Sequence, residues 1–269
     1  MIVRSDSFLM CSAGWRGDVE ALRGLVARGV SVNAWDRGDG TALKELARSY
    51  GGNFACPSRK RSTIERDAEA LDFLLEMGAD PNIKDYWGDG PLDNAALRAN
   101  RYLVGRLIDA GADVNAKRDR LTHKSDTPLH QACCLVKKDS GACAQLLIQA
   151  GARINERTTE GHTPLSMAVC KRTANPNPMI KVLLRAGAEI IKTGKRGGGN
   201  GKLFYQGMYR DNANQANLDL ITAVEKAGGW PAFVLAHRRV VVGLVTKCAP
   251  LPTDAAAHVA SFLWPEGGF

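Results

Sequence analysis

The stretch Asp126 to Asn155 opens with Thr127-Pro128-Leu129-His130-Gln131-Ala132 and closes with Leu146-Leu147-Ile148-Gln149-Ala150-Gly151-Ala152-Arg153-Ile154-Asn155. The closing half occurs again in three other places: Leu74-Leu75-Glu76-Met77-Gly78-Ala79-Asp80-Pro81-Asn82, Leu107-Ile108-Asp109-Ala110-Gly111-Ala112-Asp113-Val114-Asn115, and Leu183-Leu184-Arg185-Ala186-Gly187-Ala188. A unit that recurs in this way predicts an array in which each copy buries its apolar face against its neighbours.

These residues resemble the ankyrin repeat family, whose period is about 33 residues and whose fingerprint is T-P-L-H-x-A. The resemblance implies an all-α fold, an ankyrin-type α-solenoid of about five helix-turn-helix repeats with a small helical C-terminal segment. The step from Gly78 to Gly111 equals the family period, and the other steps between closing glycines are longer. Extra residues inside a helix would rotate its apolar face out of the stack, so we expect the insertions in loops.

The pattern divides the chain into three parts. Residues 5-193 are expected to form the ankyrin repeat array, residues 194-202 a basic Gly-rich linker, and residues 203-269 a helical C-terminal capping or adaptor segment. In the first repeat, Ala13-Gly14 is expected to end the first helix. In the C-terminal segment, helices are expected over residues 217–228, residues 231–247 and a short stretch after Thr253, which can cap it.

The fingerprint changes from repeat to repeat. The second repeat opens with Thr41-Ala42-Leu43-Lys44, and in the third Gly90 replaces Thr and Asp93 replaces His. In the family those two side chains brace the turn by hydrogen bonds, so we expect a looser opening there, with Asp93 taking over part of the bracing. His130 resembles the family histidine that bonds to the backbone of the neighbouring finger, the loop between two repeats. This implies a structural role and not that of a catalytic base.

Composition narrows the class of protein. The 269 residues are 45% hydrophobic and 24% charged, as expected of a folded, soluble chain. No apolar run approaches the roughly 18 to 20 residues of a membrane span. The first residues show no basic region followed by an apolar stretch, so no secretory signal is expected. Seven cysteines without C-x-x-C spacing suit reduced thiols in an intracellular protein. We expect a cytoplasmic location, with the nucleus as an alternative because basic clusters occur at residues 59–61 and 192–202.

The net charge of +8 raises the question of nucleic acid, but the basic residues are spread over the chain and form no stripe. We therefore do not expect a nucleic-acid partner, although the basic loops leave that alternative open. The Gly-rich linker is not a phosphate loop, because Arg196 stands where the motif needs Gly and Leu203 where it needs Ser or Thr. Cys133, Cys143 and the other thiols are expected to fill helix interfaces and not to bind metal.

No catalytic motif was found, so we expect a non-enzyme without cofactor or metal. Stacked repeats form a concave face edged by projecting fingers, and such a surface suits a protein partner. Aromatic and Arg side chains supply most interface hot spots, so the aromatic fingers are the most informative. By position within the repeat, the finger residues free to face a partner are Trp35, Arg37, Tyr86, Trp87, Asp89, Lys117, Arg118, Glu160 and His162.

The C-terminal tail provides an alternative function. An apolar helix, then Ala249-Pro250-Leu251-Pro252, then a short helix ending in Phe262-Leu263-Trp264 resembles the closing part of a SOCS box and, more loosely, an F-box. Both families recruit ubiquitin-ligase subunits, so the resemblance implies an adaptor that delivers substrates to a cullin-type ligase. The Leu-Cys signature expected early in a SOCS box is absent. A capping segment that covers the last repeat is the other interpretation of this tail.

Overall fold

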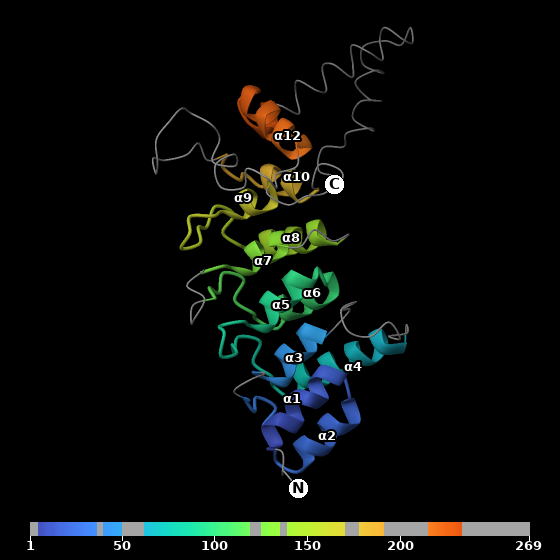
Figure 1. The fold of residues 1–269 in the computed structure, drawn as a ribbon. Coiled ribbons are helices and arrows are strands. Elements are labelled where there is room, and N and C mark those ends of the chain that lie inside the picture. Colours follow the sequence, from blue (N-terminus) through green and yellow to red (C-terminus); the bar gives the residue numbers. More distant parts are fainter. Residues whose placement is uncertain are drawn as a thin grey trace, which may run out of the picture.

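Pairs of helices stack on one another along the chain in the computed structural model (Figure 1). The structure describes residues 5–36, 40–49, 62–118, 125–134, 139–169, 178–190 and 215–232. Within this part of the chain no strand is formed, and the expected all-α solenoid is confirmed. The helices are α1 Asp6–Arg16, α2 Val19–Ala27, α3 Ala42–Ser49, α4 Ser62–Glu76, α5 Pro91–Arg98, α6 Arg101–Asp109, α7 Pro128–Cys134, α8 Ser140–Gln149, α9 Pro164–Val169, α10 Pro178–Arg185 and α12 Gln215–Lys226.

Proline and glycine set the ends of these helices. Proline stands at the first position of α5, α7, α9 and α10, where its missing N–H costs no helical hydrogen bond. After the second helix of each of the five repeats a glycine adopts positive φ, for example 79° at Gly78, and Ala79 N–H donates to the Leu74 carbonyl at 2.9 Å. The same closure follows α2, α6, α8 and α10, so each helix pair ends in one common geometry.

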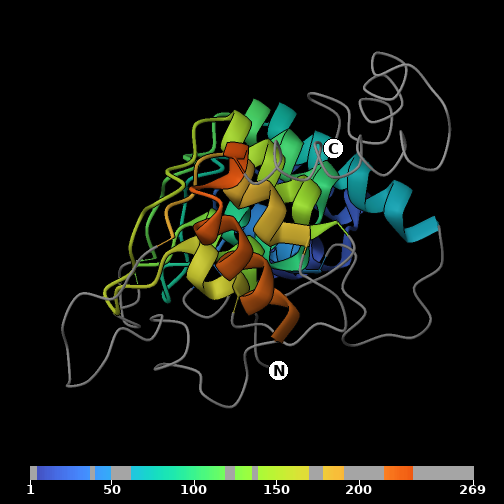
Figure 2. The ribbon, with the colours of Figure 1, turned by 90° about the horizontal axis from the view of Figure 1, so that it is seen from above.

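The core runs through the whole stack. Helices α1, α3, α5, α7 and α9 pack in a row, and α8 packs between α6 and α10. Fully buried leucines line the interfaces, among them Leu43, Leu129 and Leu165 on the first helices and Leu74 and Leu107 on the second. Each repeat therefore buries its apolar face only by contact with its neighbours. Seen from above, the loops between the helix pairs gather on one side (Figure 2).

The first helix differs from the expectation that it ends at Ala13-Gly14. It continues to Arg16 and is capped by Gly17. Gly14 lies inside the helix, where α1 packs closely against α3. A side chain at this position would collide with α3, because its Cβ atom would stand 2.4 Å from the Ala42 carbonyl oxygen. The glycine permits a close helix–helix approach and does not break the helix.

Helix α12 confirms the helix expected around residues 217–228. Ile221 and Val224 are fully buried, and Gly229 N–H donates to the Val224 carbonyl at 2.9 Å, which repeats the closure that ends α2, α4, α6, α8 and α10. In Figure 1 α12 extends the stack beyond α9 and α10. Helix α12 therefore ends in the same way as the second helix of each repeat. The basic linker and the helices expected over residues 231–247 and after Thr253 lie almost entirely outside the described residues.

One asparagine per repeat ties each closing loop to the next. Asn33 Nδ2 donates to the Gly78 carbonyl at 3.1 Å and its Oδ1 accepts from Asp80 N–H at 2.8 Å. Asn82 makes the same two bonds to the following repeat, and so does Asn115. Asn155 Oδ1 accepts from Glu189 N–H at 2.9 Å. The side-chain amide thus spans two repeats with both of its polar atoms.

Asn115→Ala is expected to lower the free energy of unfolding by about 1 to 3 kcal/mol, because it removes two hydrogen bonds between repeats. Urea denaturation followed by circular dichroism measures the loss. The control is Gln149→Ala, which truncates an exposed amide at the end of α8. Equal effects of the two substitutions would show that the asparagine bonds contribute nothing specific.

Candidate functional site

Three large aromatic side chains are exposed on neighbouring fingers, and we call them the finger aromatic surface: Trp35, Tyr86 and Trp87. Their exposed fractions are 37%, 48% and 51%. Tyr86 and Trp87 contact each other edge to face, with ring centroids 5.5 Å apart. Exposed aromatic groups of this size are the side chains that most often anchor a partner protein.

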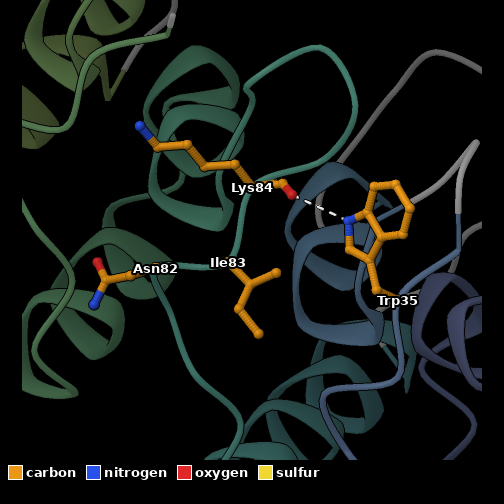
Figure 3. A pocket seen from close by; sticks show the side chains of 4 residues that line it. All are labelled: Trp35, Asn82, Ile83 and Lys84. Carbon is orange, nitrogen blue, oxygen red and sulfur yellow. Dashed lines mark hydrogen bonds between the residues drawn. The ribbon is translucent and has the colours of Figure 1, made fainter. Parts of the chain in front are cut away.

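Trp35 is held in place by the next finger. Its Nε1 donates to the Lys84 carbonyl at 3.1 Å, and a hollow of about 480 Å³ lies beside it, lined by Trp35, Asn82, Ile83 and Lys84. Figure 3 shows the indole turned toward that carbonyl while the Lys84 side chain extends away from it. The indole keeps about a third of its surface exposed, so the ring is oriented but not covered.

Three of the charged residues expected on the fingers, Asp89, Lys117 and Arg118, form ion pairs that brace the fingers. Asp89 pairs with Arg118 of the next finger, and both side chains are mostly buried. Burial raises the pKa of Asp89 against the opposing charge of Arg118. Lys117 Nζ lies 2.7 Å from Glu156 Oε1, and this hydrogen bond lowers the pKa of Glu156. Asp89 and Arg118 are therefore parts of the scaffold more than open contact points.

The last expected pair differs in its two members. Glu160 is exposed, as expected of a finger tip. His162 is only 6% exposed, and its Nε2 lies 3.3 Å from Glu160 Oε2. The expectation that His162 is free to face a partner is wrong, because its side chain is buried. Its carbonyl accepts the hydrogen bond from His130 Nε2. Arg37 lies outside the described residues.

The fingerprint position of the second repeat carries a buried charge that the sequence did not indicate. Lys44 is 4% exposed, and its Nζ lies 2.8 Å from Asp85 Oδ2 in the next finger and 3.0 Å from Glu45 Oε1. Burial opposes its charge, but the hydrogen bond to Asp85 and the charge on Glu45 outweigh that effect and raise the pKa of Lys44. Lys44 thus links two fingers at the place where the fourth repeat uses His130.

His130 has the role that the resemblance implied. Its Nδ1 accepts from Thr127 N–H at 3.2 Å, so Nε2 carries the proton and donates to the His162 carbonyl at 3.2 Å. Burial lowers the pKa of His130 to about 4, so the ring is neutral at physiological pH. Ser166, at the same position of the fifth repeat, bonds only within its own turn, to Thr163. Neither residue is placed to act as a base.

As expected, Asp93 takes over part of the bracing, because it accepts a hydrogen bond within its own turn. Its Oδ2 accepts from Gly90 N–H at 2.9 Å, which closes the turn at the start of α5. The side chain is 4% exposed, and Oδ1 has no hydrogen-bond partner. Burial raises the pKa of Asp93 to about 7, although the Gly90 hydrogen bond acts in the opposite direction. A buried carboxylate with one unsatisfied oxygen costs stability at this position.

The described residues were also compared with the requirements of a reactive thiol, a metal site and a membrane-spanning helix. Cys11, Cys133 and Cys143 are buried thiols, and burial raises the pKa of Cys143 to about 11, so this thiol stays protonated. Within the described ranges no three His, Cys, Asp or Glu side chains are arranged to hold a metal. None of the described helices is long and apolar enough to cross a membrane.

Comparison with known proteins gives these repeats a name. Residues 92–193 match the family model for ankyrin repeats in three copies. The ankyrin repeat domain-containing protein M-T5 of Myxoma virus is 47% identical over 45 residues, which are 17% of this chain and 9% of that protein. The E3 ubiquitin-protein ligase KEG of Arabidopsis thaliana is 33% identical over 94 residues, 35% of this chain and 5% of the ligase. L-asparaginase of Dirofilaria immitis is 27% identical over 153 residues, 57% of this chain and 22% of the enzyme.

Residues 92–193 thus consist of ankyrin repeats, and ankyrin repeats are protein interaction modules. The chain spans less than a quarter of the length of each of these three relatives. By their names the relatives differ in activity, so the similarity follows the repeats and not one shared reaction. The first two repeats lie before the matched residues, yet Asn33 and Lys44 join them to the array by the bonds described above.

Asp93→Asn is expected to stabilise the protein more at pH 8 than at pH 4. The folded state holds the Asp93 proton up to a pKa of about 7 and the unfolded chain only to about 3.8, so the stability of the wild type falls as pH rises through this window. Asn removes that loss, worth at most about 4 kcal/mol. Urea unfolding at both pH values measures the difference.

The matched control is Asp109→Asn, which removes an exposed carboxylate from the same repeat. His130 contributes a pH dependence of opposite sign: its pKa lies below that of a free histidine, so its contribution to stability rises with pH. This contribution is the same in the wild type and in both variants and cancels in the comparison. A stability gain of equal size at pH 4 and pH 8 for Asp93→Asn would contradict the assignment.

Proposed function

We propose that this chain is a non-enzymatic module that binds a partner protein through its fingers and the adjoining concave face. The observation that carries the proposal is the finger aromatic surface, in which Trp35, Tyr86 and Trp87 stay between 37% and 51% exposed on a braced scaffold. The buried thiols of Cys11, Cys133 and Cys143 suit a reducing compartment, so the proposed location is the cytoplasm, with the nucleus as the alternative.

The charges around the aromatic groups support a preorganised surface. The Trp35 indole is oriented by its hydrogen bond to Lys84, and the second and third fingers are fixed by the Lys44–Asp85 and Asp89–Arg118 ion pairs. Binding to such a surface requires little ordering of loops, which lowers the entropic cost of association. Lys117 and Glu160 lie farther along the same row of fingers and extend the proposed surface with charge.

Changing Trp35, Tyr86 and Trp87 together to Ala is expected to abolish partner capture by the full chain, because it removes the aromatic anchors. Affinity purification with mass spectrometry measures which partners are lost. The control changes Trp15 and Tyr102 to Ala; these side chains are equally exposed, at 44% and 46%, but lie on α1 and α6 and not on fingers. Retention of every partner by the finger variant would disprove the proposed surface.

A second candidate function is that of a substrate-recognition adaptor for a cullin-type ubiquitin ligase. The sequence order of the tail, with Pro250-Leu251-Pro252 between apolar segments and Phe262-Leu263-Trp264 near its end, favours it. One relative is named as a ubiquitin ligase. In this arrangement the array holds the substrate and the tail recruits the ligase.

The adaptor proposal predicts that cullin and its elongin or Skp-type subunits co-purify with the full chain. They are expected to disappear when Phe262, Leu263 and Trp264 are changed to Ala, while partners bound by the fingers remain. Absence of these subunits from the wild-type purification would leave the capping interpretation of the tail.

A further inference from the structure

A partly enclosed hollow of about 240 Å³ lies between the third and fourth repeats. It is bounded by the finger that leads into α5 and by the start of the next repeat. The hollow shares Asn82 and Lys84 with the larger hollow beside Trp35, so the two adjoin. Its lining residues are Pro81, Asn82, Lys84, Gly90, Leu92, Asp93, Asp113, Ala116 and Pro128.

The substitution at the fingerprint position explains why this space exists. In the fourth repeat His130 reaches across to the carbonyl of the next finger and closes the junction, and in the second repeat Lys44 reaches Asp85. Asp93 is shorter and ends on its own turn, at Gly90. The junction between the third and fourth repeats is therefore left open at the position where the neighbouring junctions are filled.

Among the side-chain atoms that line the hollow, Asp93 Oδ1 lacks a hydrogen-bond partner. The Asp93 residue is 4% exposed, and this oxygen is buried. Such an atom costs free energy unless a donor comes to it, and an ionised oxygen is best satisfied by a charged donor. The cations nearby are already engaged: Lys84 Nζ donates to the Lys117 carbonyl at 2.6 Å and Arg118 pairs with Asp89.

We propose that this hollow receives a cationic side chain, lysine or arginine, of the partner protein, and that Asp93 Oδ1 accepts its hydrogen bond. The inference rests on the proposed function and names the anchor that the partner supplies. Asp113 adds a second carboxylate to the lining, and Pro81, Leu92 and Pro128 provide apolar walls for the methylene stem of such a side chain. The position next to the Trp35 hollow places this anchor beside the finger aromatic surface.

Small probes test the site without knowledge of the partner. N-acetyl-lysine methylamide and N-acetyl-arginine methylamide are titrated into the full chain, with N-acetyl-norleucine methylamide as the uncharged control, and backbone amide signals are followed by NMR. We expect saturable shifts at Gly90, Leu92 and Ala116 with the cationic probes and none with norleucine. Whichever cationic probe binds more tightly identifies the preferred side chain.

Two variants separate binding from folding. Asp93→Asn keeps the acceptor for Gly90 N–H but loses the charge, and is expected to weaken probe binding about tenfold or more. Asp93→His places the residue of the fourth repeat in the same position, closes the hollow and is expected to abolish binding in a folded protein, as checked by circular dichroism. Unchanged binding in either variant, equal binding of norleucine, or no shift with a cationic probe up to its solubility limit would overturn the inference.

The finger variant distinguishes this inference from the proposed function. Changing Trp35, Tyr86 and Trp87 to Ala leaves Asp93 and Asp113 in place, so the probes are expected to bind it as they bind the wild type. Loss of partner capture in that variant together with failure of the probes would leave the finger surface standing and remove the cationic anchor.

Discussion

The side-chain amides of Asn33, Asn82 and Asn115 each donate to one repeat-closing carbonyl and accept from a backbone N–H two residues farther along. Because the same asparagine offers both a donor and an acceptor, it fixes the distance and the register between consecutive repeats. Leucine packing alone is not directional and would tolerate sliding. The array depends on these bonds to hold the fingers in a row, and the proposed binding surface is distributed over that row.

The fingerprint position acts as a second link between repeats, and here the chain varies its chemistry. Lys44 and His130 both reach the next finger, the first through an ion pair and the second through a neutral ring. Ser166 and Asp93 bond within their own turns. Lys44 loses its hydration on burial and contacts two carboxylates instead. A buried ion pair stabilises the fold only when its polar atoms are all hydrogen-bonded. Asp93 is buried with one oxygen that has no hydrogen bond, and in this its junction differs from the others.

The sequence predicts those parts of the structure that depend on local signals. Prolines at the starts of α5 and α7 and glycine at 78 and 111 specify helix ends, because their backbone preferences act without tertiary context. Gly14 shows the limit: the pattern suggests a helix end, but the close approach of Ala42 places the glycine within the helix. That contact spans two repeats and leaves no mark on the local sequence.

The candidate site was predictable in its residue types and less so in its geometry. Trp35, Tyr86 and Trp87 are exposed where the repeat position places them, whereas His162 at an equally regular position is buried under its finger. The burial of Lys44 depends on Asp85 in the following repeat, and a lysine in a sequence pattern is normally assigned to solvent. In both cases the deciding partner belongs to another repeat.

A residue that departs from the repeat pattern points to a binding site only where it leaves a buried polar atom without a hydrogen bond. Gly90 and Asp93 replace the two bracing residues of the third repeat, and the result is an open junction with a buried carboxylate oxygen that has no hydrogen bond. Ser166 is also irregular, but all its bonds are made locally, so its substitution requires no external ligand. Stability alone would favour filling the junction at Asp93. The unsatisfied Asp93 oxygen costs free energy in the unbound protein, and it lies beside a row of exposed aromatic groups. A partner that supplies a hydrogen-bond donor on binding would offset that cost.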